Sequence, residues 1–272
     1  MTKTRKILLL LLYTAVWGAV GTYFFFAVRE CRSRRDGLMV SDLRIEVRDS
    51  AMGFVTAGMV REWFDEGGLV FRGMRAAEIN TAEVERFLRG RGFVKSADVY
   101  TDLTGRLTIE LTQRRPLMRV KTTGGYDFFV TDDGYVLPAR SRSARYLQVV
   151  TGDFTPPFEE GFEGSVEDKM TEEEKNSDKN YLFFTKLVNF ARLVENDRFW
   201  SSQIVQTVAS ADGTLELVPR AGNHVILFGE PEDAQRKLEK LKLFYKNALS
   251  WEGWSNWRCI DIRYDNQIVC TK

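Results

Sequence analysis

The sequence predicts an α+β protein with three parts: a single N-terminal transmembrane helix, a small unit of order β-α-α-β-β, and a mostly antiparallel β domain with flanking helices. Three observations predict this class. Residues 7–28 carry no charge. Residues 40–115 change from two-residue to helical periodicity and back again. Residues 116–272 contain many short apolar runs separated by turn residues, with longer helical patterns among them.

The apolar run at 7–28 is long enough for one membrane crossing, because about 20 apolar residues span a bilayer as a helix. A cleaved signal peptide would have a shorter apolar core and would end in small residues, whereas this run ends Phe-Phe-Phe-Ala-Val. A lipid attachment at Cys31 would need small apolar residues before it, and charged residues stand there. A buried core helix is normally shorter and more amphipathic. We therefore expect a retained anchor, with residues 1–6 as a short tail and residues 29–39 as a stalk.

The composition excludes several classes of function. Of the 272 residues 44% are hydrophobic, which is enough for one or two cores, and the formal net charge is +1. Such a small charge creates no overall field that attracts nucleic acid. No C-x-x-C pair and no H-E-x-x-H occurs, so the common zinc signatures are missing. We expect no metal and no cofactor. The one histidine, His224, is interpreted as a strand residue.

The three cysteines are too few to build a disulfide scaffold. Cys259 and Cys270 lie in patterns typical of late strands. Either they form a disulfide outside the cytosol, or they serve as small apolar filler.

Residues 40–115 are predicted to form one small unit. Apolar and charged residues alternate over 43–47, which indicates a strand. Two helical faces follow, each after a capping residue, Thr56 and Asn80. Two more strands come next, with a tight turn between them. The expected core residues are Leu43, Ile45, Val60, Trp63, Phe64, Val84, Phe87, Leu88, Val99, Leu107 and Ile109.

The β domain at 116–272 begins where Pro116 interrupts the strand pattern. Helices are expected at 181–196 and 231–249, and a strand is expected at 199–208. Short strands and turns occupy most of the remaining sequence.

An acidic loop is predicted at 158–179, because carboxylates are dense there and apolar residues are few. We interpret it as a mobile surface loop or the frayed start of a helix. The ligand spacing of a calcium-binding loop is missing.

The C-terminal region ends on a strand pattern that runs to within two residues of the last residue. The helix before it has an outward face of cations, among them Arg236 and Lys240. Trp251, Trp254 and Trp257 stand three residues apart, a spacing that favours fixing a helix end onto a sheet.

Several segments in fixed order resemble the FtsQ/DivIB family of bacterial cell-division proteins. Residues 40–111 look like the family's POTRA domain, and the sequence Q-R-R-P at 113–116 is similar to its junction motif. Residues 132–138 resemble its D-x-x-G-x-x-x-P hairpin. Residues 217–224 and 262–270 are similar to the β domain of the branch found in Bacteroides relatives. The last turn departs from the family, since it reads Asp-Asn-Gln where many relatives have Asn-Gly.

The resemblance implies a non-enzymatic scaffold in the cell inner membrane, with a cytoplasmic N-terminus, periplasmic C-terminal domains and a place at the division septum. It implies binding to the small coiled-coil proteins FtsB and FtsL and to other divisome proteins, which links the chain to septal peptidoglycan synthesis. Positive charges flank both ends of the apolar run, so charge alone does not settle the orientation.

A terminal strand without a neighbour is a template for adding another strand. We therefore expect the partner-binding residues to lie at the C-terminal edge. They are Tyr264, Asn266, Ile268, Val269 and Trp257.

The alternative function is a membrane-anchored periplasmic enzyme using carboxylate chemistry. With one histidine, no G-x-S-x-G and no S-x-x-K, an acid pair is the remaining mechanism, and 38 Asp and Glu residues leave a glycosidase-like pair open. An outer-membrane assembly factor with POTRA domains is a further alternative. It would need a long run of alternating strands to build a barrel.

Overall fold

The computed structural model describes residues 13, 15–29, 37–48, 54–139, 147–249, 253 and 256–272. The chain divides into two compact units, Met1–Gln113 and Arg114–Lys272. Each unit has its own sheet and its own hydrophobic core. The α+β class expected from the sequence is confirmed.

Near the N-terminus, residues 15–29 are helical and exposed. The part of the chain that the structure describes contains no helix long and apolar enough to cross a membrane. Of the predicted span 7–28, residues 7–12 and 14 lie outside the described residues. The predicted tail 1–6, most of the predicted stalk and Cys31 lie outside them as well.

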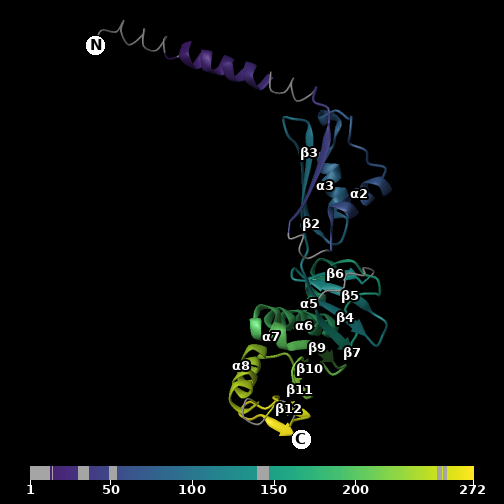
Figure 1. Cartoon of the computed structure of the whole chain (residues 1–272), viewed down its shortest axis with the longest axis vertical. Helices are drawn as coiled ribbons and strands as arrows, with labels where there is room; N and C mark the ends of the chain where they lie inside the picture. The colour runs from purple at the N-terminus through teal and green to yellow at the C-terminus, as the bar shows by residue number, and fades with distance from the viewer. Residues whose placement is uncertain are drawn as a thin grey trace, which may run out of the picture. The chain divides into compact units, whose positions relative to one another are not determined.

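The first unit has the predicted β-α-α-β-β order, with a short 3-10 helix added. Its elements are β1 Asp42–Arg48, α2 Ala57–Glu66, η2 Ala76–Glu78, α3 Thr81–Arg89, β2 Val94–Thr101 and β3 Arg106–Gln113. The strand order is β1-β3-β2. β1 pairs in parallel with β3, and β2 pairs antiparallel to it. Figure 1 shows α2 and α3 on the same side of these strands.

Local chemistry explains where the two helices begin. The Thr56 side chain accepts a hydrogen bond from Met59 N at 3.2 Å, and the Asn80 side chain accepts one from Glu83 N at 3.3 Å. Each cap satisfies an N–H group that the first turn leaves without a helical partner. The helices then bury one apolar stripe each against the sheet. The buried residues include Val60, Phe64, Val84, Leu88, Leu107, Ile109 and Leu111.

Four predicted core residues are only partly buried instead: Leu43 and Ile45 on β1, Trp63 on α2 and Phe87 on α3. The Phe87 ring stacks on Phe64 at a centroid distance of 6.1 Å, and the Arg91 guanidinium lies 5.0 Å from the Phe87 ring centroid. The Phe87 ring therefore contacts both a core ring and a surface cation.

The second unit contains one ten-stranded sheet with helices along one side of its strands (Figure 1). Its first strands are β4 Pro116–Thr122, β5 Asp127–Thr131, β6 Tyr135–Pro138, β7 Gln148–Gly152 and β8 Gly164–Ser165. The helices α4 Val166–Lys169, α5 Glu172–Ser177, α6 Lys179–Asn196 and α7 Arg198–Gln203 follow. The remaining elements are β9 Ile204–Ala209, β10 Leu215–Pro219, β11 Val225–Gly229, α8 Ala234–Phe244, η3 Tyr245–Leu249, β12 Cys259–Asp261 and β13 Val269–Thr271.

The strand order is β13-β12-β11-β10-β9-β7-β4-β5-β6-β8. Most neighbours are antiparallel, as predicted. The parallel pairs β4–β7, β7–β9 and β11–β12 were not predicted. Gly152 permits one of them, because a Cβ at its φ of +132° would lie 1.9 Å from the carbonyl oxygen of Ala209. The sheet is therefore mixed.

The predicted strand at 199–208 is wrong in its first half, where the chain forms α7. The Asp197 side chain accepts hydrogen bonds from Phe199 N at 2.8 Å and Trp200 N at 3.2 Å, which starts a helix. The helical turn buries Trp200, which is 1% exposed. The strand β9 begins only at Ile204.

The acidic segment 158–179 is more structured than its composition suggested, since it contains β8, α4 and α5. In α5 the Thr171 side chain accepts from Glu174 N, and the Glu174 carboxylate accepts from Thr171 N at 2.9 Å. This reciprocal capping box stabilises a short helix in a sequence that has few apolar residues.

Candidate partner-binding edge

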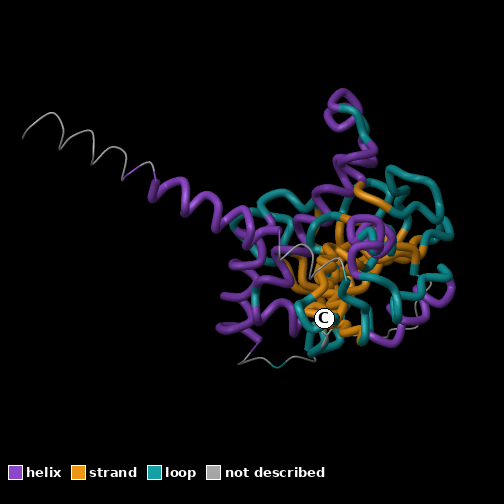
Figure 2. Tube along the Cα trace, turned by 90° about the horizontal axis from the view of Figure 1, so that it is seen from above, coloured by secondary structure: helices purple, strands orange, loops and turns teal. Residues whose placement is uncertain are grey.

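The strand β13 forms one edge of the ten-stranded sheet, and β8 forms the other. β13 pairs antiparallel with β12, and the C-terminus follows directly after it (Figures 1 and 2). One side of β13 has no strand beside it among the described residues. Such an edge presents backbone N–H and C=O groups that can pair with a further strand.

The predicted contact residues lie at or beside this edge. Val269 opens β13 and is 43% exposed, and Tyr264, in the connection from β12, is 48% exposed. Asn266 is exposed in the same connection. Trp257 precedes β12 and is partly buried against the core, with Lys272 Nζ 5.4 Å from its ring centroid.

The pairing register assigns each residue of β13 to a face of the sheet. Cys270 pairs with Ile260, which is fully buried, and Val269 pairs with Asp261. Because neighbouring strand residues point to opposite faces, Cys270 packs on the core and Val269 lies on the other face. Ile268 also packs against the core. Of the two predicted contacts Ile268 and Val269, Val269 is therefore the more accessible one.

Cys259 and Cys270 are not joined in a disulfide. Cys259 pairs with Thr271, whereas Cys270 pairs with Ile260. The two thiols therefore start on opposite faces of the β12–β13 ladder, a geometry that does not suit a disulfide. Cys270 packs on the core, as the apolar interpretation expects, whereas Cys259 lies on the other face of the ladder. Burial raises the pKa of the Cys259 thiol above its ordinary value.

The residues that hold the β12–β13 connection were not apparent from the sequence. Lys240 was expected to point outward into solvent. Instead its Nζ donates hydrogen bonds to the carbonyl oxygens of Ile262 at 3.0 Å, Tyr264, and Gln267 at 3.5 Å. Arg236, four residues earlier, donates to Asp265 Oδ1 at 2.7 Å. The sequence shows that Arg236 and Lys240 share one face of a helix, but it does not show that this face meets the β12–β13 connection.

An ion pair between Asp261 and Arg263 lies at the C-terminal end of β12. Arg263 Nη2 donates to Asp261 Oδ2 at 2.7 Å, and Arg263 Nε donates to Asp261 Oδ1 at 2.9 Å. These hydrogen bonds lower the pKa of Asp261 and raise the pKa of Arg263. Gly229 makes room for the arginine, because a Cβ there would lie 2.9 Å from Arg263 Cγ. Desolvation lowers the pKa of the nearby Lys240.

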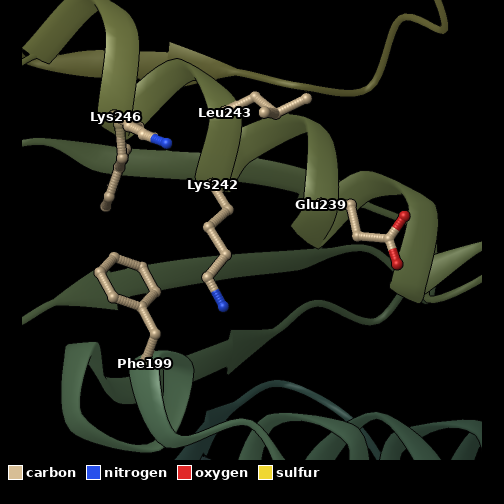
Figure 3. A pocket seen from close by; sticks show the side chains of 6 residues that line it. Phe199, Glu239, Lys242, Leu243 and Lys246 are labelled. Atoms are coloured by element: carbon tan, nitrogen blue, oxygen red, sulfur yellow. The ribbon is translucent and has the colours of Figure 1, made fainter.

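A groove of about 660 Å³ lies where α7 faces α8 and η3. Figure 3 shows Lys242 extending toward the helix that carries Phe199, while Leu243 lies on the outer side of α8. Lys242 pairs with Asp197 at 2.9 Å and lies 5.2 Å from the Phe199 ring centroid. Tyr245, which also lines the groove, hydrogen-bonds to His224 at 2.8 Å, and its burial raises its pKa. His224 directly precedes β11, just outside the strand in which the sequence placed it, and it is buried in this structural contact.

The carboxyl groups give no support for a glycosidase-like acid. Such an acid needs a raised pKa, whereas the described carboxyl groups with clear shifts all have lowered values. They are Asp102, Glu110, Glu174, Asp197, Asp212, Glu232 and Asp261. Within the described residues no group of three or more His, Cys, Asp or Glu side chains is placed to hold a metal ion.

The fold and the edge define a two-unit protein, with a β-α-α-β-β unit followed by a mixed-sheet unit that ends on an edge strand. The POTRA-like domain family matches residues 39–112. The family described as FtsQ/DivIB, C-terminal related, matches residues 115–271. The chain therefore belongs to the FtsQ/DivIB family of cell-division proteins, as the sequence resemblance indicated. No curated protein matches the chain significantly.

Proposed function

We propose that this chain is a membrane-anchored, non-enzymatic scaffold of the bacterial divisome. In this proposal it binds small coiled-coil partners of the FtsB and FtsL type and links them to septal peptidoglycan synthesis. The binding site is the open edge of β13 with the side chains around it. The anchor is the apolar run at 7–28, and the two units are periplasmic.

The observation that carries this proposal is the edge position of β13, combined with membership of a cell-division family. Addition of a partner strand would continue the backbone ladder, and alternate side chains would provide specificity. Val269 and Thr271 are the exposed residues of β13. Tyr264 and Asn266 extend the exposed surface along the connection.

A pull-down of a purified FtsB-like partner with two truncations tests the site. Deleting the residues after Asn266 should abolish binding, because it removes the whole edge strand. Shortening the acidic segment 158–179 should leave binding intact. The opposite result, with binding lost only in the second truncation, would place the interface elsewhere.

Proline substitutions distinguish a loss of partner binding at the edge of β13 from a loss of folding. Successive N–H groups of a strand point to opposite edges, so Ile268→Pro and Val269→Pro remove donors of opposite direction. The proline that removes an outward donor should block partner binding while the melting curve changes little. The other should disturb the pairing with β12. If both bind the partner normally, strand addition is wrong.

Two observations in cells test the wider proposal. The mature protein should retain its N-terminus and stay with membranes after carbonate extraction. A mature N-terminus near residue 30 would contradict the anchor. A fluorescent fusion should form a midcell ring, whereas uniform envelope fluorescence would favour the alternative of an anchored periplasmic enzyme.

A further inference from the structure

The connection between β12 and β13, residues 262–268, is hydrogen-bonded to a single ammonium group. Lys240 Nζ donates to carbonyl oxygens of Ile262, Tyr264 and Gln267, which lie at the start, middle and end of the connection. Lysine has three N–H donors and no acceptor. Three carbonyl groups of one loop therefore match its full donor set.

The position of Lys240 on α8 follows from helical spacing. Leu238, Leu241 and Tyr245 are buried and form the core face of the helix region. Arg236 and Lys240, at i and i+4, lie on a different face. Arg236 donates to Asp265 at 2.7 Å in the same connection. Side chains from two successive turns of α8 thus donate hydrogen bonds to the β12–β13 connection.

The strand that follows this loop is short. β12 and β13 pair over Cys259–Asp261 and Val269–Thr271, and Arg258 N donates to Thr271 O at 2.9 Å beside them. Residues 263–267 of the connection are exposed, and of β13 only Cys270 packs on the core. A strand this short is marginal unless its neighbours fix it. The hydrogen bonds from Lys240 and Arg236 to the connection, called the α8 clamp, therefore supplement the three-residue pairing of β13.

We propose that Lys240 is a positioning residue for partner binding: it holds the β12–β13 connection so that the edge of β13 is preformed for an incoming strand. This inference rests on the proposed function, because it assigns Lys240 a role at the same edge. Lys240 itself does not touch the partner. A preformed edge lowers the entropy that binding must overcome, so loss of the clamp weakens binding even though no contact residue changes.

The test compares Lys240→Met with Lys237→Met in the full-length protein. Methionine keeps an unbranched stem and removes the donors. Lys237 is a matched control on the same helix, since its Nζ donates to Glu230 O at 2.6 Å and not to the connection. Should Lys240→Met lower the overall melting temperature, Lys240→Gln, which keeps an N–H donor group, repeats the comparison with a milder change.

Cys270 provides a readout of the edge without the partner. In a background with Cys31→Ser and Cys259→Ser, Cys270 is the remaining thiol of the three in the sequence. Lys240→Met should increase its rate of maleimide labelling at least about fivefold, because an opening of β13 exposes this core-facing side chain. It should also weaken the affinity for a purified FtsB-like protein by about tenfold, or about 1.4 kcal/mol. Lys237→Met should change neither value.

The outcomes separate this inference from the proposed function. If Lys240→Met matches Lys237→Met in labelling or in affinity, the positioning role is overturned. The proposed function then still stands, provided that deleting the residues after Asn266 abolishes binding. If that deletion leaves the affinity unchanged, the proposed function fails, and this inference fails with it.

Discussion

The three-stranded sheet of the first unit and the C-terminal end of the ten-stranded sheet are held in different ways. β1 pairs with β3 along its whole length, Asp42–Arg48 against Arg106–Thr112, and two helices bury one face of that sheet. β13 pairs over Val269–Thr271 and leaves one side open. The first arrangement suits a rigid module, whereas the second leaves an edge strand with a short pairing, whose local opening costs less than that of β1. Binding regions are commonly of the second kind.

The largest expected effect distinguishes a true core position from a rim position in the first unit. Leu88→Ala should cost about 2–5 kcal/mol of unfolding free energy, because Leu88 is fully buried. Phe87→Ala should cost clearly less, since that ring is only partly buried. Chemical denaturation followed by circular dichroism measures both. Equal losses would show that the ring of Phe87 is as much a part of the core as Leu88.

A smaller effect is expected at the junction motif 113–116. The Arg114 guanidinium pairs with Asp133 and lies 3.8 Å from the Tyr135 ring centroid, with its side chain 17% exposed. Arg114→Met should destabilise the second unit by about 1–3 kcal/mol.

Its neighbour Arg115 is the matched control. Arg115 pairs with Glu195 at 3.4 Å, and both side chains are more than 40% exposed. Arg115→Met should therefore cost less than about 1 kcal/mol. If denaturation experiments show a larger loss for Arg115→Met than for Arg114→Met, then Arg115 and not Arg114 is the structurally important arginine of the motif.

The pH dependence of the unfolding free energy can be tested at one carboxylate in each unit, Glu110 in the first and Asp261 in the second. Hydrogen bonds from Arg263 lower the pKa of Asp261, and hydrogen bonds from Tyr100 and Arg48 lower the pKa of Glu110. A depressed pKa stabilises the folded state above the unfolded pKa of about 4, and that stability is lost as the pH falls through the folded value. Both Asp261→Asn and Glu110→Gln should flatten the stability curve below about pH 4. A slope unchanged by either variant would contradict its ion pair.

The smallest effect on stability is expected at the edge itself. Val269→Ala should change the unfolding free energy by no more than about 0.5 kcal/mol, because Val269 is 43% exposed. Under the proposed function, the same variant should measurably weaken the affinity for an FtsB-like protein. Isothermal titration and denaturation of one preparation give both values. A variant that loses stability but keeps its affinity would place Val269 in the fold rather than in the interface.

The sequence alone identified the features that depend on neighbours a few residues away. The alternation over 43–47, the caps at Thr56 and Asn80, and the terminal strand pattern each follow from local periodicity and side-chain chemistry. The family resemblance carried by short motifs was also visible, and the family matches agree with it. One local signal was overlooked, since Asp197 before Phe199 marks a helix start by the same capping rule.

Tertiary structure decided the features that depend on distant partners. The parallel pairings β4–β7, β7–β9 and β11–β12 join segments far apart in the chain, so no local period encodes them. The opposite faces of Cys259 and Cys270 follow from the β12–β13 register. Lys240 is an ordinary exposed-face cation by spacing, and only the folded chain brings three carbonyl groups to it. Periodicity tells which face of an element is polar, whereas long-range packing determines what that polar face meets.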